Sequence, residues 1–530
     1  MRIRVVAVVL ILSGCAARGP KVPPYAEFLG KAEALLGAGC YVCLQESQAL
    51  LAKVLSSKTP PPGAAEKAFD VALLIAIREK ELGIPGDASM AAALRLLPAA
   101  PDRSSVGEAK SVAVPRRTVY DAAQLIAGDL SALDPDMRAK STADRVRVGL
   151  GPDNPARRAL DAAPDTDLAA KYVALSIDCE QQKLIESIDM PAMRSKYDGV
   201  PLMLFKLSTC GRPAGPSVGA LRAGDPRWAD TLYWEGRREL AASLGTAIDF
   251  PKALGFFADG RKAFPDSLLL TMAWANTNMA GEEFEGALSG FDEVIAKYPT
   301  HRDALSGRMQ ALSYLMRHVD AIEAATRLLD LGTWHIGDAN YWRAWNRYHL
   351  KDYESAWIDI ENATKGLSNA RVYMLAGLIA YSRKDLPTAV QRFDHAFQID
   401  STACDAVWMS GLVNIDQNEL ATAAPKFTRS MTCFTSSAAA LRGDAARIRA
   451  VVDKRGTPAT PREQRNLERS ERDASNAEEK SAQSAYNAAQ CYARTGDRGL
   501  ALNLIDVAID HPAMKEKAMA MKAAIEKLPK

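Results

Sequence analysis

The residues best suited to chemistry are few in this chain, which holds eight cysteines and six histidines among 530 residues. No histidine stands at metal-ligand spacing from another histidine, a cysteine pair or an acidic cluster, so the sequence predicts no metal centre. It also contains no G-x-S-x-G, phosphate-loop or dinucleotide-binding motif. We therefore predict that the protein is not an enzyme and needs no cofactor. The histidines are His301, His318, His335, His349, His395 and His511.

The overall composition predicts a folded protein with a sizeable core. Hydrophobic residues make up 48% of the chain and charged residues 25%, and the formal net charge is only +2. This balance excludes a disordered chain and an integral membrane protein. Because basic residues are not in marked excess, nucleic acid is not an expected partner.

Residues 1–14 have the three parts of a secretory signal. Arg2 and Arg4 precede the unbroken apolar run Val5–Leu12, and two small residues follow it. As a helix this run would rise about 12 Å, which is too short to cross a bilayer. The next residue is a cysteine, and the tetrad Leu12-Ser13-Gly14-Cys15 resembles the lipobox of bacterial lipoproteins.

The lipobox resemblance implies that residues 1–14 are a cleaved signal peptide and that Cys15 carries the lipid. Because Ala16 and not aspartate follows the cysteine, it also implies an outer-membrane lipoprotein of a Gram-negative cell, facing the periplasm. Residues 15–24 would be a short extended tether, and the lipid would be the only contact with the membrane. An ordinary signal with a chance cysteine is the alternative.

The second half of the chain repeats with a period of about 34 residues. From Ala253 to Ala423, alanines recur at intervals of 34, 34, 35, 33 and 34 residues, and Ala501 follows after 78, which is 34 plus 44. A small residue precedes each alanine by twelve positions in all but one case, and a bulky residue usually follows four positions later. Small residues let two antiparallel helices approach closely, while the bulky residue fills the space toward the next pair.

This pattern resembles the tetratricopeptide repeat (TPR). The segment Gly281-Glu282-Glu283-Phe284 matches its helix-turn-helix corner, and Pro265 and Pro299 fall at its closing proline. The resemblance implies an all-α, TPR-type α-solenoid, in which antiparallel helix pairs stack into a right-handed superhelix and the first helices line a concave face. Seven repeats are expected to begin at Trp234, Leu268, Arg302, Gly337, Ala370, Cys404 and Ala482.

These repeats define the expected domains. Residues 25–228 have helical spacing without a clean period and predict an irregular helical region with degenerate repeats. Residues 229–436 would form an array of six repeats, and residues 437–481 would be inserted helices. Residues 482–530 would hold the seventh repeat and a capping helix.

The insertion itself predicts two helices. The first covers Ser437–Arg455, the segment Gly456–Pro461 breaks it, and nothing interrupts a helix from Arg462 to Thr495. From Arg462 to Gln483 this second helix has one large aliphatic residue, Leu467, among many charges. We expect that part to project into solvent or to meet a polar partner.

Seven cysteines remain if Cys15 is acylated, so at least one has no partner within the chain. Cys404 and Cys433 fall at positions 1 and 30 of the sixth repeat. Because the first helix of an antiparallel pair begins beside the end of the second, their α-carbons could approach the roughly 5.5 Å that a disulfide requires. We predict that bond. Cys40 and Cys43 form either a local disulfide or two buried thiols, Cys179 and Cys210 are a third candidate pair, and Cys491 is a core thiol.

Carrying over the groove positions of the TPR family gives an apolar and aromatic trough. In that family, positions 2, 5, 9, 12 and 13 of the first helix usually face the groove. The alternative is that all of these side chains belong to the core. Tyrosine and tryptophan in a concave wall carry much of the energy of protein interfaces. The residues expected to bind a partner there are Tyr314, Tyr341, Trp345, Tyr348, His349, Met374, Leu378, Tyr381, Trp408 and Leu412.

The residues at positions 5 and 9 bear on the kind of ligand. The family's clamp for a C-terminal carboxylate uses lysine and asparagine there, whereas this chain has, for example, Tyr341 and Trp345, then Met374 and Leu378. A free peptide end is therefore not the expected ligand, and an amphipathic helix or an apolar extended segment fits better.

Together these features predict a membrane-tethered periplasmic scaffold that binds a partner protein of an envelope machine, for secretion, pilus formation, motility or outer-membrane assembly. Its architecture resembles the repeat lipoproteins that serve such machines. The alternative is a glycan-capturing outer-membrane lipoprotein, whose aromatic platform would stack sugars. That family mixes in long loop insertions rich in asparagine and aromatic residues, whereas this chain keeps a regular array.

Overall fold

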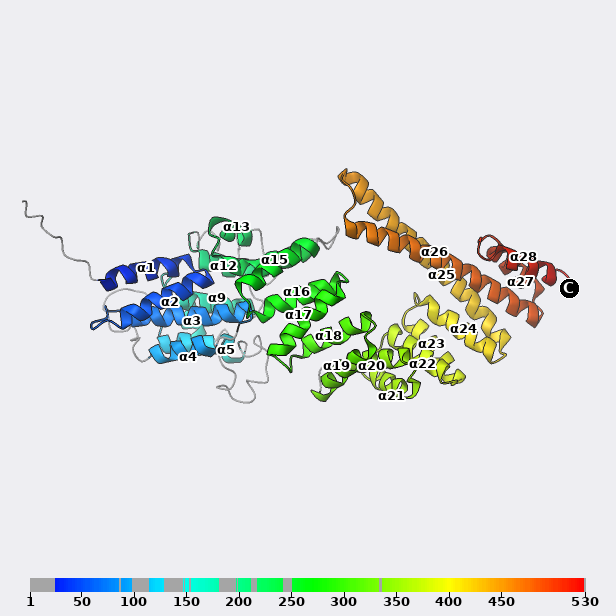
Figure 1. Ribbon diagram of the computed structural model, residues 1–530, viewed down its shortest axis with the longest axis horizontal. Coiled ribbons are helices and arrows are strands. Elements are labelled where there is room, and N and C mark those ends of the chain that lie inside the picture. The colour runs from blue at the N-terminus through cyan, green and yellow to red at the C-terminus, as the bar shows by residue number, and fades with distance from the viewer. Residues whose placement is uncertain are drawn as a thin grey trace, which may run out of the picture. The chain divides into compact units, whose positions relative to one another are not determined.

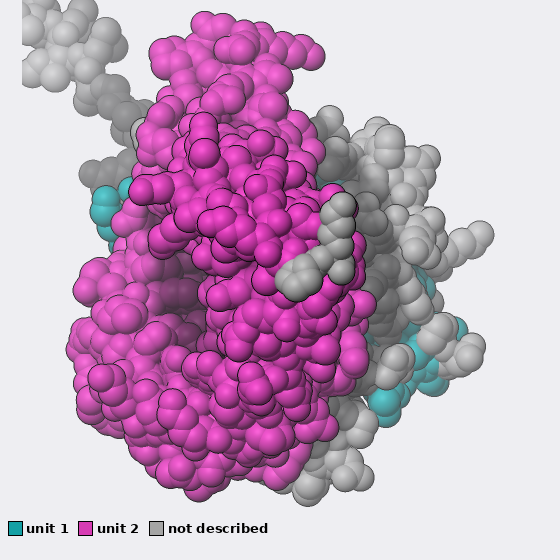
Figure 2. Space-filling model, turned by 90° about the vertical axis from the view of Figure 1, so that its right-hand side faces the viewer, with its two compact units in different colours: residues 1–241, 255–270 teal, residues 242–254, 271–530 magenta. Residues whose placement is uncertain are grey.

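A computed structural model shows a helical protein in two compact units (Figure 1). It describes residues 24–84, 87–97, 114–127, 146, 148–151, 154–180, 197, 199–210, 217–241, 250–332 and 336–528. Every regular element in these ranges is a helix, and the predicted all-α, TPR-type solenoid is confirmed. Unit 1 comprises residues 1–241 and 255–270, and unit 2 comprises residues 242–254 and 271–530 (Figure 2).

Unit 2 is built mainly of antiparallel helix pairs stacked side by side (Figure 1). The first helices of the second to sixth predicted repeats begin at or within one residue of the expected starts. They are α16 (Leu268–Ala280), α18 (Arg302–Tyr314), α20 (Ile336–His349), α22 (Ala370–Ser382) and α24 (Cys404–Asp416). The second helices are α17 (Phe284–Lys297), α19 (His318–Asp330), α21 (Tyr353–Thr364), α23 (Leu386–Ile399) and the start of α25 (Leu420–Arg455).

The turns between the paired helices share one backbone conformation. In each of these five repeats a residue other than glycine adopts positive φ, for example 59° at Met316 and 66° at Lys384. Side chains seldom adopt this left-handed conformation outside tight turns. The same corner therefore recurs through the array at Glu282, Met316, Lys351, Lys384 and Asn418, with Gly496 at the matching place in the seventh repeat.

Close packing inside each pair explains the small residues of the period. A Cβ placed on Gly377 of α22 would lie 2.5 Å from ring atoms of Phe393 on α23, so a larger residue cannot fit without a shift. The Phe393 ring and the periodic Ala389 are both fully buried. The regular spacing of small and bulky residues thus results from helix contacts that recur along the stack.

Helices α25 and α26 (Pro461–Thr495) are the longest in unit 2 and lie antiparallel as a hairpin that projects from the array (Figure 1). Gly456, in the left-handed conformation, ends α25, and a capping box formed by Thr460 and Glu463 stabilises the start of α26. Two short helices, α27 (Arg498–Ile509) and α28 (Lys515–Ile525), complete the C-terminal end.

The helix over Arg462–Gln483 does not stand alone in solvent. Its alanines Ala474 and Ala477 are buried against α25, where Ala438 and Ala445 are also buried. The expected polar partner is therefore the other helix of the insertion, to which it is joined by arginine–glutamate pairs.

Unit 1 has a less regular arrangement of shorter helices around α3 (Ala64–Leu82), whose side chains are buried along most of its length. The other helices are α1 (Pro24–Ala38), α2 (Tyr41–Leu55), α4 (Asp87–Leu96), α5 (Arg116–Ala127), α8 (Pro155–Ala162), α9 (Leu168–Glu180), α12 (Pro201–Thr209), α13 (Ser217–Gly224), the 3₁₀ helix η4 (Ala229–Thr231), α14 (Leu232–Ala241) and most of α15 (Phe250–Ala263). Much of the first predicted repeat thus belongs to this unit.

Two buried arginines tie the helices of unit 1 together. Arg78 of α3 is fully buried and pairs with Asp230 of η4 and Glu81, while its guanidinium lies 3.7 Å from the centre of the Phe205 ring. Arg116 pairs with Glu66, Asp70 and Asp167 at 2.8–3.0 Å. A buried charge needs such partners because its desolvation is otherwise costly.

Among the cysteines that the structure describes, three disulfides link six. The predicted bond between Cys404 and Cys433 is present, with α-carbons 5.5 Å apart. Cys179 also bonds to Cys210, and Cys40 bonds to Cys43, which selects the local disulfide over two buried thiols. Cys491 is a free thiol, and burial raises its pKa.

Candidate functional site: the concave face of the helix array

The first helices of the array and the starts of three second helices carry a continuous series of ring contacts, which we call the ring ladder. It begins with Phe284, whose ring stacks on Tyr314 with centres 4.7 Å apart. Tyr314 then meets Trp342 at 5.4 Å, and Trp342 meets Trp345 at 5.9 Å. The ladder comprises Phe284, Tyr314, Trp342, Trp345, His318, His349, Tyr348 and Tyr353.

A histidine pair lies in the middle of the ring ladder. The rings of His318 and His349 stack 5.2 Å apart and nearly parallel, and Trp345 lies 4.1 Å from His349. Burial lowers the pKa of His349, and the neighbouring His318 lowers it further. Nδ1 of His318 is 2.9 Å from the side-chain oxygen of Asn346, which fixes the orientation of that imidazole.

The predicted groove residues of the fourth repeat differ in exposure. His349 is exposed, and Trp345 and Tyr348 are half-buried, so part of each ring faces outward. Tyr314, in the preceding repeat, is 47% exposed. These four side chains can contact a ligand without unfolding any helix.

Tyr341 corrects the sequence prediction. Its side chain is only 5% exposed, packed beside Trp342 at 5.4 Å between ring centres. The guanidinium of Arg371, from the next repeat, lies 4.9 Å from the centre of its ring. Tyr341 is therefore a packing residue, because a cation–π contact from α22 covers the face that we expected to be open.

The fifth and sixth repeats continue the apolar character of this face. Met374, Leu378 and Tyr381 are half-buried on α22 and pack against one cluster that includes Phe393. The hydroxyl of Tyr381 donates a 2.8 Å hydrogen bond to Asp416 of α24, and this bond raises the pKa of Tyr381. Trp408 and Leu412 are half-buried on α24 and pack beside the seventh repeat.

None of Trp345, Tyr381 and Trp408 is sealed inside the protein, since each is half-buried on a first helix. Figure 2 looks along the long axis of Figure 1 and shows a hollow in the surface of unit 2. The set of groove residues stays a prediction, with Tyr341 removed from it.

Four members of the ring ladder were not among the predicted groove residues: Trp342, Phe284, His318 and Tyr353. Phe284 and His318 begin second helices, at the place in the repeat where Tyr353 begins α21. An aromatic or imidazole ring at that place in three successive repeats was a signal that could have found them. The groove positions carried over from the TPR family all lie on first helices, so they do not include this place.

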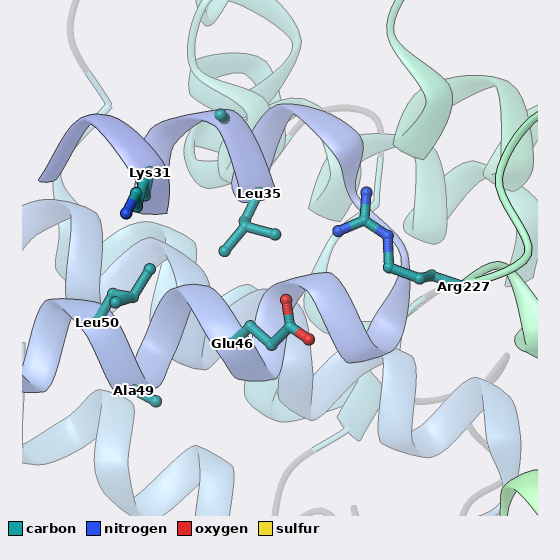
Figure 3. A pocket seen from close by; sticks show the side chains of 7 residues that line it. Lys31, Leu35, Glu46, Ala49, Leu50 and Arg227 are labelled. Carbon is teal, nitrogen blue, oxygen red and sulfur yellow. The ribbon is translucent and has the colours of Figure 1, made fainter. Parts of the chain in front are cut away.

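Two cavities lie away from the ring ladder. In unit 1, a cavity of about 590 Å³ opens between α1 and α2, with Leu35 and Leu50 inside and Lys31, Glu46 and Arg227 at its charged edge (Figure 3). In unit 2, a cavity of about 750 Å³ lies beside the Cys404–Cys433 disulfide, with Phe397, Arg429 and several hydroxyl side chains in its wall. Neither cavity is lined by a predicted groove residue.

In the described parts of the chain, no group of three or more His, Cys, Asp or Glu side chains is placed to hold a metal ion. In the same residues, no helix combines the length and the apolarity needed to cross a bilayer. Cys15, the predicted lipidation site, and residues 1–23 of the leader and tether lie outside the described residues.

Comparison with known proteins gives similar structures only. No family model matches the chain, and no curated protein matches it either. Among solved structures, the C-terminal part of a TPR-containing protein from Cytophaga hutchinsonii is 12% identical over 56% of this chain and 98% of that one, with a TM-score of 0.39. PilF of Pseudomonas aeruginosa is 12% identical over 51% and 99%, with a TM-score of 0.33.

A third similar structure is YrrB, described as a TPR protein with an unusual peptide-binding site. It is 17% identical over 44% of this chain and 97% of its own, with a TM-score of 0.31. Identities and TM-scores this low carry no argument, and the repeats are established by the helices of this chain itself.

Proposed function

We propose that the chain is a scaffold that binds a partner protein on the concave face of its helix array. The observation that carries this proposal is the ring ladder, a series of ring contacts across three successive repeats whose members Tyr314, Trp345, Tyr348 and His349 stay at least partly exposed. Aromatic rings held in fixed positions lose little side-chain entropy on binding and bury large areas. An apolar extended segment or an amphipathic helix is the matching ligand.

The proposed location is the outer membrane of a Gram-negative cell, with the array in the periplasm and the partner belonging to an envelope machine. The support is the lipobox-like tetrad ending at Cys15 and the three disulfides, which suit an oxidising compartment. Catalysis is not part of the proposal. A Cys15→Ser variant is expected to leave the membrane fraction, and its continued sedimentation with membranes would contradict the tether.

Site-specific photocrosslinking tests the binding face. A benzophenone side chain at Tyr314, in the full-length protein in native envelopes, is expected to capture one defined partner. Ile358 on α21 of the fourth repeat is the matched control position, since it is 63% exposed but lies on a second helix. Trp345→Ala with Tyr348→Ala is expected to abolish capture at Tyr314.

Three outcomes would contradict the proposal. These are equal capture at Tyr314 and Ile358, unchanged capture in the double variant, and no capture at all. Saturable quenching of tryptophan fluorescence by oligosaccharides, lost in the same double variant, would instead favour the glycan-capturing alternative.

A further inference from the structure

The insertion forms a stiff rod, which we call the hairpin arm and define as residues 437–481. Its two helices meet along a seam of buried alanines, with Ala445 on α25 and Ala474 on α26 almost fully buried. Small residues let the helix axes come close together. Along the side of this seam, arginines of α25 pair with glutamates of α26: Arg442 with Glu478 at 2.9 Å, Arg449 with Glu471, and Arg455 with Glu463 at 2.7 Å.

The base of the hairpin arm is fixed to the sixth repeat. Nζ of Lys480 is 2.5 Å from a carboxylate oxygen of Asp405 on α24. The hydroxyls of Thr435 and Ser481 share a 2.8 Å hydrogen bond between α25 and α26. The Cys404–Cys433 disulfide joins α24 to α25 two residues before Thr435. The arm therefore cannot swing freely at its base.

The far part of the hairpin arm touches the array at a distant repeat. The guanidinium of Arg469 on α26 binds the carboxylate of Glu282 in the α16–α17 turn, with N–O distances of 2.9 and 2.5 Å. These residues are 187 positions apart in the chain. Figure 1 shows the array of α16 to α24 curving beneath the hairpin.

This contact is unusual for a solenoid. Repeats in such a stack normally contact only their neighbours, so that the whole array can stretch and bend. The Arg469–Glu282 pair instead links the insertion that follows the sixth repeat to the second repeat. Glu282 lies two residues before Phe284, the first ring of the ring ladder, so the arm meets the array beside the proposed binding face.

The two ends of the hairpin arm differ greatly in strength. The base has a disulfide and several polar contacts, whereas Arg469 and Glu282 are about half exposed, at 46% and 53%. Exposed ion pairs are weak and are screened by salt. Breaking this exposed pair therefore costs less than breaking the base, where the Cys404–Cys433 disulfide is covalent.

We propose that the hairpin arm is a clasp that sets the opening of the concave face, with the Arg469–Glu282 pair as its releasable contact. With the pair formed, the array is held at one curvature and the space over the first helices is bounded by the arm. With the pair broken, the array spreads and admits a bulkier partner. Ionic strength, or a partner that competes for Glu282, shifts the balance between the two forms.

A distance measurement between the arm and the array tests this proposal. Spin labels are introduced through unnatural amino acids at Lys454, which is exposed near the tip of the arm, and at Val319, which is 68% exposed at the start of α19. In the full-length protein at low salt, a short-distance population is expected. Arg469→Glu, or 0.5 M NaCl, is expected to reduce the ratio of short to long distances about two- to fivefold.

Two further variants make the result decisive. Arg472→Glu changes the net charge equally on the same helix, but Arg472 pairs with Asp473, so the short population is expected to persist. The exchange Arg469→Glu with Glu282→Arg is expected to restore it. The proposal is overturned if the short population is absent throughout, is insensitive to Arg469→Glu, falls equally with Arg472→Glu, or is not restored by the exchange. Since no partner is present, these outcomes are independent of the proposed function.

Discussion

Each of the two units of this chain is stabilised internally by a different kind of contact. In unit 2, the recurring contact joins a small residue to a large ring, as when Phe393 fills the space left by Gly377. In unit 1, the most deeply buried side chains include the cations Arg78 and Arg116, which bind carboxylates from several separate helices. In unit 2 the same type of packing contact recurs along the chain, whereas in unit 1 each arginine cluster is formed by a different set of residues.

This difference shows why one half of the chain has a readable period and the other does not. A contact between a helix and its immediate partner recurs at the spacing of the repeat, so its residues recur as well. A pair such as Arg78 and Asp230 connects residues 152 positions apart and leaves no spacing to detect. The comparison also predicts opposite sensitivities, to loss of charge in unit 1 and to added volume in unit 2.

The largest effect is expected from Arg78→Met in unit 1. The substitution removes the cation from Asp230, which is fully buried, while Glu81 keeps its pair with Lys206. An uncompensated buried charge should lower the free energy of unfolding of unit 1 by about 3–5 kcal/mol. Urea titration followed by hydrogen exchange in α3 peptides measures this change.

Two variants check the interpretation of that loss. Arg117→Met removes an exposed arginine that pairs with Asp121, and it should change stability by no more than about 0.5 kcal/mol. Adding Asp230→Asn to Arg78→Met should recover part of the stability, because the unpaired charge is removed. Equal losses from Arg78→Met and Arg117→Met would show that buried charge does not hold unit 1 together.

A smaller effect is expected when volume is added in unit 2. In Gly377→Ala the new methyl group lies 2.5 Å from the Phe393 ring, whereas Gly443, on the hairpin arm, has nothing within 4 Å of its added Cβ. Both glycines are inside helices, so alanine brings the same gain in helix propensity, about 1 kcal/mol. The Gly377 variant should nevertheless be less stable than the Gly443 variant by about 1–3 kcal/mol.

The measurement for this pair is chemical unfolding of both variants and the parent protein. Hydrogen exchange should place the loss at α22 and α23, because each repeat contacts mainly its neighbours. If both alanine variants stabilise the protein equally, close approach at Gly377 is not the reason for the small residue there.

Much of the array could be predicted from the sequence because its contacts are local. The spacing of Ala389 and Phe393 marks the second helix of the fifth repeat, and the places of Cys404 and Cys433 in one repeat were enough to expect their disulfide. The break between the two helices of the insertion was also expected from the segment that ends at Pro461, but the first of them does not begin at Ser437: it continues the second helix of the sixth repeat, so that α25 begins at Leu420.

The parts that could not be predicted depend on contacts between distant repeats or helices. Tyr341 was expected to be open because it stands at a groove position of the TPR family, and the cation that covers its ring, Arg371, belongs to the next repeat. Arg469 meets Glu282 only because curvature accumulates over several repeats, which the local pattern does not specify. The charged clusters of unit 1 have no recognisable sequence motif because their members are far apart in the chain, as Arg78 and Asp230 are.

The smallest predicted effect is a change in the stability of α20 with pH, which tests whether unit 2 also contains a charge-sensitive repeat. Burial and the neighbouring His318 lower the pKa of His349 below its ordinary value of 6.5. Between that value and the lower folded pKa, the unfolded chain binds more protons than the folded chain, so stability falls as the pH falls. The ring ladder should therefore loosen as the pH drops from 7.5 to 5.5, seen as faster hydrogen exchange in α20.

Substitution of single histidines separates this effect from general acid sensitivity. His349→Gln removes the titrating group and should flatten the pH dependence of exchange in α20. His395→Gln is the matched control, because His395 contacts Tyr373 outside the ring ladder, and it should leave the dependence in α20 as in the parent protein. If the parent shows no acid-induced loosening, or if both variants flatten it equally, the stacked pair is not its source. A loss confined to α20 would show that the stability of a repeat in the regular array also depends on a charge, as we predict for unit 1 at Arg78.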